Sequence, residues 1–590
     1  MKRDLFKALN IEQKNAALHI NGPSVILAGA GSGKTRVLVY KVLNLILCHN
    51  TPPSLIIMIT FTNKAASEMK ARINMHLQNR EQSKLGFVGT FHSFCAHILR
   101  KSGHNIGIKN NFIIYDNNDS INLIKKILKE NNTGRITPSY VLNRISSAKS
   151  QLIDYKRYGD VFGDYNAGEI AEIYLKYEKI KQKNNALDFD DLIMKTVQLF
   201  IKKSFVLEEY QEKFKYILVD EFQDTNYSQY SLTRLLGEKY QNVTVVGDFS
   251  QSIYSWRGAD IRNLDKFNED FPESKTFNLE QNYRSTQNIL NFAHSIISKN
   301  ETHPVLDLFT ENKKGEEVEI HESENEEHET LYIVSEINNL KQKLQLNSFA
   351  VLYRTNAQSR IIEESFLHYG IPYVLIGGTR FYERREIKDI ISYLRLFINP
   401  KDELSKDRII KLGKRRWEKF TKFYRKTKKE VFKIPTVELI EQIFQETGYI
   451  QKYNSDDQED YARLENINEL KSVAMSFSQV DKFLEQVALV ESEYFEGEKQ
   501  KKDGVRLMTL HQAKGLEFPV VFIAGVEEGI LPHARSIEDY FQLEEERRLF
   551  YVGVTRAQKK LYITYATKRF IFGKRGITEK SRFLEEKDMF

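Results

Sequence analysis

The stretch that decides the fold is Ser24-Val25-Ile26-Leu27-Ala28-Gly29-Ala30-Gly31-Ser32-Gly33-Lys34-Thr35. An apolar run of strand length leads into a glycine-rich loop that closes on Lys34 and Thr35, and helical apolar spacing follows. In such a unit the backbone N–H groups and the helix N-terminus attract an anion. Lys34 reaches the β- and γ-phosphates and Thr35 ligates Mg²⁺. The stretch therefore predicts a nucleoside triphosphate site; a turn that binds nothing is the alternative.

Composition limits the remaining possibilities. The chain has 590 residues, of which 41% are hydrophobic and 28% charged, so we expect several globular domains. The net charge of +7 is compatible with a polyanionic partner. The two cysteines, Cys48 and Cys95, favour a reducing compartment and exclude a cysteine-based zinc site. We find no secretory signal and no apolar run of membrane-spanning length, so we expect a cytoplasmic protein without a membrane partner.

A second strand-like run, residues 216–219, delivers two acids, Asp220 and Glu221. Hydrolysis of Mg-ATP needs one carboxylate at the metal and another that orients and deprotonates water. We assign the first role to Asp220 and the second to Glu221. Paired acids after a strand also occur in ordinary turns, but here they accompany a phosphate loop.

Other apolar runs end in loops that mix hydroxyl, amide and aromatic side chains. Runs at residues 55–59 and 243–247 predict further parallel strands, with the ligand at their carboxyl edge. A second loop of this kind is expected at residues 89–94. Aromatic rings beside hydroxyls suit a nucleic-acid strand whose bases stack. The candidate residues are Phe61, Thr62, Thr90, His92, Tyr254, Trp256 and Arg257. The alternatives are a structural role for His92 and a buried anchor at Trp256.

Helical segments interrupt both α/β patterns. Residues 100–185 predict one inserted helical domain, followed by Asp188, Asp190 and Asp191, which either begin a helix or pair with basic loops. A second α/β unit begins with strands at 349–353 and 373–376, is interrupted by helices over 381–503, and resumes at 505. The basic cluster over residues 414–429 is either a solvated surface or a nucleic-acid face. The acidic run 316–329 predicts a strand and then a solvated helix start.

Two residues have weaker signals. Gln13 lies on a predicted helix before the phosphate loop, and its amide can read an adenine edge or simply be solvated. Arg556 follows a small-residue turn, where an arginine can neutralise charge that develops on a γ-phosphate. A surface arginine is the alternative there.

Together these stretches resemble superfamily 1 helicases of the UvrD/PcrA/Rep group. The motifs occur in family order and include, besides the phosphate loop and the acid pair, Thr60-Phe61-Thr62-Asn63-Lys64-Ala65-Ala66, Gly89-Thr90-Phe91-His92-Ser93-Phe94, Gln251-Ser252-Ile253-Tyr254-Ser255-Trp256-Arg257, Gln281-Asn282-Tyr283-Arg284, His511-Gln512-Ala513-Lys514-Gly515-Leu516-Glu517 and Val552-Gly553-Val554-Thr555-Arg556-Ala557. Ala28 at the first position of the phosphate loop is usual for this family.

The resemblance implies an α/β fold with two RecA-like parallel-sheet (P-loop NTPase) domains, each with a mostly helical insertion. The first domain is expected over 1–88 and 190–279, with its insertion at 89–189. The second domain is expected over 280–380 and 504–590, with its shortened helical insertion at 381–503.

The resemblance also implies residue roles around ATP and Mg²⁺. Gln13 would contact adenine, Arg36 and Tyr283 would sandwich it, and Glu517 would touch the ribose. Gln251 would sense the γ-phosphate, with Arg284 and Arg556 as arginine fingers from the second domain. Along single-stranded DNA it implies the candidate residues named above, with His511 added.

The implied activity is ATP-driven 3′-to-5′ movement on single-stranded DNA with duplex unwinding, in repair or replication restart. The implied partners are single-stranded DNA, single/double-strand junctions and repair or replication proteins, for a nucleoid-associated monomer or weak dimer. The alternative is a DNA-stimulated ATPase that remodels protein–DNA complexes with little strand separation. Two departures from the family are visible. Phe249-Ser250 replace two acids, which alters the surroundings of Gln251 and the metal. A duplex-gripping turn is reduced to Leu412-Gly413, which motivates the alternative function.

Overall fold

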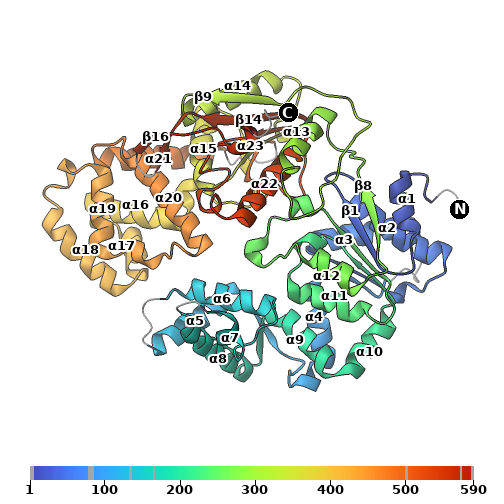
Figure 1. Cartoon of the computed structure of the whole chain (residues 1–590). Coiled ribbons are helices and arrows are strands. Elements are labelled where there is room, and N and C mark those ends of the chain that lie inside the picture. Colours follow the sequence, from blue (N-terminus) through green and yellow to red (C-terminus); the bar gives the residue numbers. More distant parts are fainter. Residues whose placement is uncertain are drawn as a thin grey trace. The chain divides into compact units, whose positions relative to one another are not determined.

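The computed structural model describes residues 5–77, 85–131, 136–163, 166–497, 503–571 and 574–585. The chain divides into two compact units, the first formed by Met1–Arg284 with Asn300–Asn312 and the second by Ser285–Lys299 with Lys313–Phe590 (Figure 1). The sequence-based boundary at residue 280 stays a prediction. Among the described residues, no helix is long and apolar enough to cross a membrane.

The first unit is built on a six-stranded parallel sheet of order β3-β2-β6-β7-β1-β8. Its strands are β1 (Ser24–Ala28), β2 (Ile56–Thr60), β3 (Phe87–Thr90), β6 (Tyr216–Val219), β7 (Val243–Gly247) and β8 (Lys275–Leu279). The predicted parallel strands are confirmed. The expected loop at residues 89–94 is instead the end of β3 and the start of helix α4, with Thr90 as its N-cap.

Helices cover both faces of this sheet, which explains why its central strands are apolar on successive residues. Ile26, Met58 and Leu218 pack on one face, and Val25, Ile57 and Val219 pack on the other. The helices around it are α1 (Ile11–Leu18), α2 (Lys34–Leu43), α3 (Asn63–Leu77), α4 (Phe91–Ser102), α9 (Phe189–Lys202), α10 (Ser204–Lys213), α11 (Tyr227–Gly237) and α12 (Asn263–Asp270).

The first helical insertion has a core of its own, centred on residues such as Ile145, Ile170 and Tyr177. It contains β4 (Ile113–Tyr115), α5 (Asn117–Glu130), α6 (Pro138–Ser150), α7 (Tyr158–Val161), α8 (Ala167–Lys183) and β5 (Ala186–Asp188). Asp188 caps α9 by accepting from the Asp191 N–H at 2.8 Å, and it also pairs with Lys149 and Lys181. Asp188 therefore begins a helix, as one alternative held, and its basic partners lie on helices α6 and α8 rather than on loops.

The second unit carries another six-stranded parallel sheet, of order β11-β12-β10-β13-β14-β9. Its strands are β9 (Glu319–Ser323), β10 (Phe349–Tyr353), β11 (Tyr373–Leu375), β12 (Val505–Thr509), β13 (Phe518–Ile523) and β14 (Ala557–Ala566). Helices α13 (Gln287–Ile297), α14 (Glu326–Leu340), α15 (Ser359–His368), α22 (Tyr540–Val554) and α23 (Arg582–Glu585) belong to the same unit. Two sheets of this kind confirm the predicted α/β class.

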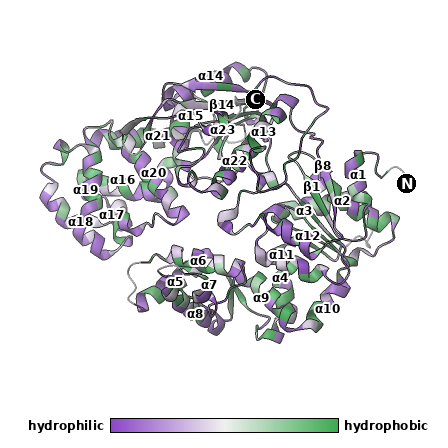
Figure 2. Cartoon of the chain, viewed as in Figure 1, coloured by the Kyte–Doolittle hydropathy of each residue, from purple (hydrophilic) through white to green (hydrophobic). Residues whose placement is uncertain are grey.

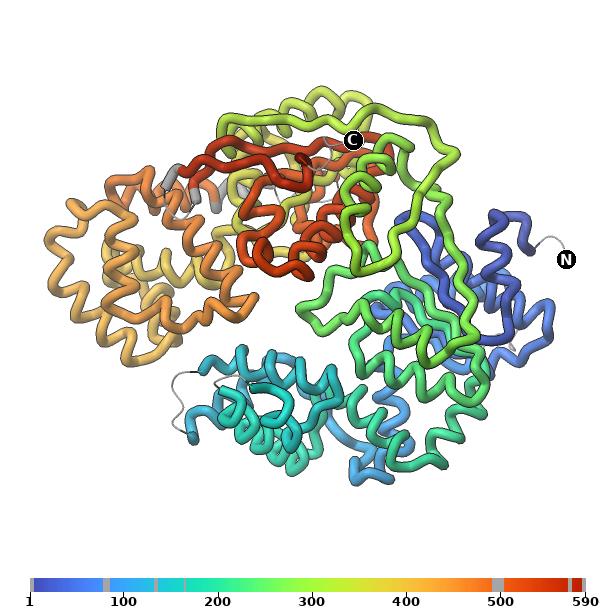
Figure 3. Tube along the Cα trace, viewed as in Figure 1, coloured from blue at the N-terminus to red at the C-terminus, as the bar shows by residue number. Residues whose placement is uncertain are grey.

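The second insertion is an all-helical body with its own core, which includes Ile390, Phe420 and Leu470. Figure 3 draws it in yellow and orange, and in the sequence it lies between β11 and β12 of the second unit. Its helices are α16 (Arg385–Ile398), α17 (Glu403–Lys411), α18 (Lys414–Thr427), α19 (Thr436–Thr447), α20 (Gln458–Ala474) and α21 (Val480–Gly497). Hydrophobic colour gathers along the strands in Figure 2, whereas α18 is mostly hydrophilic.

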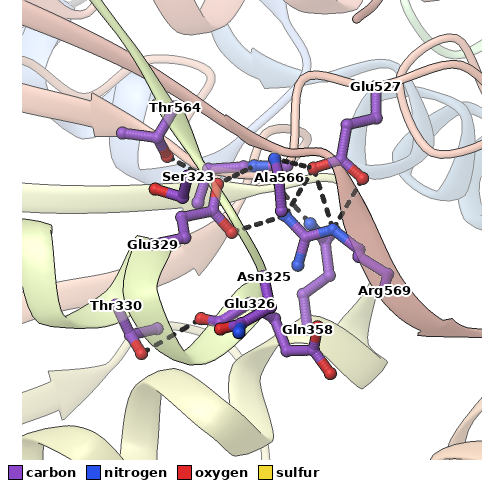
Figure 4. Close-up of polar contacts among 12 residues, drawn as sticks. Ser323, Asn325, Glu326, Glu329, Thr330, Gln358, Glu527, Thr564, Ala566 and Arg569 are labelled. Atoms are coloured by element: carbon purple, nitrogen blue, oxygen red, sulfur yellow. Dashed lines mark hydrogen bonds and ion pairs between the residues drawn. The ribbon is translucent and has the colours of Figure 1, made fainter. Parts of the chain in front are cut away.

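The acidic run before α14 corrects one expectation. The strand is present as β9, and Glu327 at the start of α14 is exposed as expected, but Glu329 is only 2% exposed. It accepts hydrogen bonds from Gly525 N at 2.8 Å and Thr564 Oγ1 at 2.6 Å, and it pairs with Arg569 (Figure 4). Arg569 lies on β15 (Lys568–Ile571), which pairs with β16 (Lys574–Ile577), and it also binds Glu527. The acid therefore anchors this hairpin instead of facing water.

Candidate functional site

The phosphate loop joins β1 to α2 and depends on two left-handed glycines, Gly31 at φ 66° and Gly33 at φ 86°. Space is limiting as well as conformation. A Cβ on Gly33 would lie 2.9 Å from Gln13 Nε2, and one on Gly31 would lie 2.8 Å from Asn282 Nδ2. The loop opens directly into α2 at Lys34, so its N–H groups lie at a helix N-terminus.

Gln13 is fully buried beneath this loop. Its amide donates to Ser32 O at 2.8 Å, and its side-chain oxygen accepts from Asn10 N at 3.2 Å in a capping box for α1. Gln13 therefore braces the loop whether or not it reads a base, and its adenine contact stays a prediction.

The predicted acid pair lies against the loop lysine. Lys34 Nζ is 3.5 Å from Glu221 Oε2. Burial alone would lower the pKa of Lys34, but Glu221, Asp248 and Asp220 together raise it. Burial, reinforced by Glu221, raises the pKa of Asp220 to about 7 although Lys34 opposes it. Glu221 adopts φ 53°, a conformation that is costly outside glycine and recurs at functional sites.

The donors here fit a hard divalent cation. Asp220 Oδ1 is buried without a hydrogen-bond partner, and so is Ser32 Oγ in the loop. Buried polar oxygens are normally satisfied, and Mg²⁺ selects oxygen ligands. Thr35, the predicted metal ligand, stands in the first turn of α2. Asp220 and Thr35 are thus residues that could hold such an ion.

Gln251 lies in the loop after β7. Its side-chain amide donates to Asp248 Oδ2 at 2.6 Å, and both residues are buried. The two residues that depart from the family have structural partners: Phe249 joins the core, and Ser250 Oγ lies 3.1 Å from His303 Nε2. The departure therefore changes packing around Gln251 and supplies no additional acid.

The segment Gln281–Arg284 lies on the phosphate loop within the first unit. Asn282 Nδ2 donates to Ala30 O at 2.6 Å, and Tyr283 N donates to Gly31 O at 3.0 Å. The ring of Tyr283 is 45% exposed, and its hydroxyl donates to Gln281 Oε1 at 3.0 Å. The contacts of the chain place Arg284 in the first unit, as the last residue of the segment Met1–Arg284. The family resemblance instead implies that Arg284 belongs to the second domain.

The predicted DNA-binding residues of this unit lie in two groups, one around Phe61 and one around Trp256. Phe61 lies edge-on to Phe91, with ring centroids 6.0 Å apart. Trp256 is 48% exposed, and the guanidinium of Arg257 lies over its ring at 4.5 Å, with Tyr254 beside it. The exposed Trp256 ring favours the stacking platform over the buried anchor.

His92 lies edge-on to Phe189, with centroids 5.7 Å apart, and burial lowers the pKa of His92. Thr90 caps the helix that carries it. Phe189 is half exposed and was missed by the sequence analysis. No local signal distinguished it, because Phe91 stands at the same position of α4, directly after the Thr90 cap, and is buried.

In the second unit the structure brings Glu517 and Arg556 to the amino ends of neighbouring strands. Phe518 N donates to Arg556 O at 2.9 Å, and Gln558 Nε2 donates to the exposed Glu517 at 3.1 Å. The Arg556 guanidinium is 1% exposed and donates to Val552 O at 2.9 Å and Leu516 O at 3.1 Å. His511 is half-buried in the loop that follows β12.

Comparison with protein-family models defines the class of protein. Residues 9–272 match the UvrD/REP helicase N-terminal domain, and residues 277–434 and 414–568 match the UvrD-like helicase C-terminal domain. These matches cover most of the described fold. The chain therefore belongs to the UvrD/REP helicase family, as the motifs predicted.

Curated relatives agree along the whole chain. The ATP-dependent DNA helicase PcrA of Bacillus subtilis is 41% identical over 640 aligned residues, which cover 99% of this chain and 86% of that protein. PcrA of Staphylococcus epidermidis is also 41% identical, and PcrA of Staphylococcus aureus is 40% identical, with the same coverage of both chains. This chain is similar to each of them over nearly its full length.

Proposed function

We propose that this UvrD/REP-family chain is an ATP-dependent DNA helicase that moves 3′ to 5′ on single-stranded DNA and separates the duplex ahead of it. The observation that carries the proposal is the acid pair Asp220–Glu221 against Lys34, in the same unit as the exposed Trp256 ring. An ATP-hydrolysing site and a base-stacking platform in loops of the same sheet-based unit are what a motor on DNA requires. The family match supports the helicase activity.

Hydrolysis uses side chains with separate roles. Lys34 and the loop N–H groups bind the phosphates, and Glu221 accepts the proton of the attacking water. Asp220 and Thr35 would hold Mg²⁺, which neutralises phosphate charge when bound. Gln251, held by Asp248, would sense the γ-phosphate. Glu221 has a left-handed backbone conformation, and its carboxylate lies 3.5 Å from Lys34 Nζ.

The remaining nucleotide contacts belong to the same proposal. Gln13, Arg36 and Tyr283 would hold adenine, and Glu517 would contact the ribose. Arg284 and Arg556 would neutralise charge at the γ-phosphate, a role for which the planar, permanently charged guanidinium is suited. In the second unit Arg556 already binds backbone carbonyl oxygens, so its guanidinium would exchange those partners for phosphate.

DNA contacts would come from rings and hydroxyls rather than from base-reading amides. Trp256 and Tyr254 would stack bases, as would the Phe189 ring beside His92, while Thr62 would bind the backbone. Stacking tolerates every base, so it suits movement along any sequence. Phe61, Thr90, Arg257 and His511 complete the proposed path.

The second insertion carries a basic surface that supports contact with a duplex. On α18 and just after it, the exposed cations are Lys414, Arg415, Lys419, Lys422, Arg425, Lys426, Lys428 and Lys429. Such a row attracts phosphates without reading sequence. The reduced turn at Leu412-Gly413 favours a second candidate function, an ATPase that moves on DNA and remodels protein–DNA complexes with little strand separation.

Two assays test the proposal. ATP hydrolysis should rise with single-stranded DNA and fall at least about 100-fold in Lys34→Ala and Glu221→Gln. A duplex with a 3′ single-stranded tail should be unwound, and one with a 5′ tail should not. Gln211→Met, a change at a buried glutamine that binds Leu235 O at 2.7 Å, is the control for folding.

The outcomes separate the candidates. Hydrolysis that is indifferent to single-stranded DNA would overturn the motor. Normal DNA stimulation with neither duplex unwound would favour the remodelling ATPase. We place the activity in repair or replication restart, at single/double-strand junctions and with repair or replication proteins as partners, for a nucleoid-associated monomer or weak dimer. Analytical ultracentrifugation and pull-down from lysate test those assignments.

A further inference from the structure

Gln223 lies in the acidic loop after β6 and is fully buried. It has no place in the roles assigned above. Its side chain nevertheless contacts two functional segments at once, the proposed general base and the loop after β7. This position makes it a candidate for a link between them.

The contacts fix which way its amide points. Gln223 Nε2 donates to Glu221 Oε2 at 2.5 Å and to Asp224 Oδ2 at 3.3 Å. Its Oε1 accepts from Asp248 N at 3.1 Å. A flipped amide would place an oxygen against two carboxylates and an NH₂ against an N–H, so only this orientation is satisfied.

A second contact ties the same residue to the same loop. Ser252 Oγ donates to the backbone carbonyl of Gln223 at 3.0 Å. The packing is tight, because a Cβ added to Gly247 would lie 2.7 Å from Gln223 Oε1. Displacement of the segment from Asp248 to Ser252 therefore displaces the Gln223 amide.

That segment continues directly into the proposed DNA platform. Ser252 and Ile253 are buried, and Tyr254 and Trp256 follow within four residues. Only a short, well-packed stretch separates rings that would stack on bases from the amide that holds Glu221. Gln251, which would sense the γ-phosphate, lies inside the same stretch and is bound to Asp248.

We propose that Gln223 is a positioning residue that couples the DNA platform to the general base, so that stimulation of ATP hydrolysis by DNA passes through its amide. DNA bound at Tyr254 and Trp256 shifts the segment Asp248–Ser252, and Gln223 transmits the shift to the Glu221 carboxylate. This inference rests on the proposed function, since it takes Glu221 as the base and Trp256 as a DNA contact.

The test compares Gln223→Met with Gln211→Met. Both changes remove a buried amide of similar volume in the same unit, but Gln211 lies away from the site. Basal and oligothymidine-stimulated hydrolysis are measured together with the KM for ATP, oligothymidine affinity and melting temperature. We expect the ratio of stimulated to basal rate to fall at least about tenfold in Gln223→Met, because small misplacement of a catalytic group is costly. KM, affinity and the Gln211→Met ratio should stay within about twofold of wild type, which a loss of folding would not allow.

A second variant keeps the test decisive if Gln223→Met does not fold. Ser252→Ala removes one bond to Gln223 and should lower the same ratio by a smaller factor. An unchanged ratio in the folded variants overturns the coupling, even if both rates fall together. Wild-type hydrolysis without DNA stimulation would instead overturn the proposed function, so the two failures are distinguishable.

Discussion

Two groups of buried and half-buried acids in the first unit are compensated in opposite ways. In the first insertion, Glu178, Asp188 and Asp191 lie within 4.8 Å of one another and surround two buried lysines. In the sheet, Asp220 and Glu221 meet a single lysine, Lys34, which other acids also share. The first group therefore already contains the cations that it needs, whereas the second shares one lysine among several acids.

The ionisation of each group follows from that difference. Lys149 and Lys181 pair with Asp188 at 2.7 Å each. Although burial opposes ionisation, these lysines lower the pKa of Asp188 well below its usual range and that of Glu178 to about 2. Burial instead raises the pKa of Asp220 to about 7. A self-compensated cluster is structural, whereas an under-compensated one is prepared for a charged ligand.

The largest expected effect is loss of a lysine from the compensated group. Lys149→Met should lower the free energy of unfolding by about 3–5 kcal/mol, because it leaves Glu178, Asp188 and Asp191 to share Lys181 and under-compensates their buried charge. Urea titration followed by circular dichroism measures this. Lys176→Met, on the exposed side of the same insertion, should change stability by less than about 0.5 kcal/mol. A loss below about 1 kcal/mol at Lys149 would contradict the structural assignment.

The pH dependence of stability should separate Asp220 from Asp188. Because the folded pKa of Asp220 is raised, the folded chain binds the extra proton between about pH 4 and 7, and stability falls as pH rises through that window. Asp220→Asn removes this dependence. In metal-free buffer it should therefore gain on the order of 3 kcal/mol relative to wild type between pH 5 and pH 8.

Asp188→Asn is the matched comparison, and its sign is reversed. The folded pKa of Asp188 is lowered, so its contribution is present above about pH 4 and is lost only in acid. Asp188→Asn should lose stability at pH 8, whereas Asp220→Asn should not. Unfolding curves at both pH values check this, and equal signs would show that the two acids are compensated alike.

The contrast also explains what sequence alone could predict. Asp220 and Glu221 follow a strand that is buried on both faces, so an uninterrupted apolar run in the sequence indicates where they lie. The phosphate loop could also be predicted, because its glycines, lysine and helix are contiguous in the sequence. The edge strand β8 was not predicted, because it is exposed along much of its length and contains Lys275, Thr276 and Asn278. An edge strand needs no continuous apolar pattern.

Features that depend on distant partners could not be predicted. Glu329 was expected to be solvated, yet its partner Arg569 lies 240 residues away in the chain. Lys149 reaches Asp188 across 39 residues, and nothing in its own helix marks it as buried. Charged residues are usually exposed, so only the folded contacts reveal these exceptions. The Gln223 amide belongs to the same class, because Asp248 becomes its neighbour only through pairing of β6 with β7.

A divalent cation should stabilise the folded chain by binding at Asp220 and not at the Glu178, Asp188 and Asp191 cluster. At pH 8, Mg²⁺ at ten times its dissociation constant should stabilise wild type by about 1.4 kcal/mol, by mass action on the folded state. The shift should disappear in Asp220→Asn and persist in Glu178→Gln. Melting temperature with Mg²⁺ or EDTA is the measurement. Loss of the shift in Glu178→Gln would move the cation site to the insertion.

The smallest change in the free energy of unfolding is expected at Glu527, whose buried charge is only partly compensated by Arg569. In the second unit Arg569 binds both Glu527, at 2.6 Å, and Glu329, so two buried acids share one guanidinium (Figure 4). Backbone N–H groups supply the rest, including Ala566 N to Glu527 Oε1 at 2.6 Å. Burial raises the pKa of Glu527 although Arg569 opposes it.

Glu527→Gln should therefore change the free energy of unfolding by no more than about 1 kcal/mol at pH 8. It removes an acid that ionises at a cost, and the amide oxygen can still accept from Ala566 N and Arg569. Urea unfolding checks this beside Glu322→Gln, a change at an exposed acid bonded to Tyr565. A loss above about 3 kcal/mol would mean that Glu527 is as fully compensated as Asp188. Stability would then depend on the ion pair itself, and the hydrogen bonds that Gln can replace would contribute little.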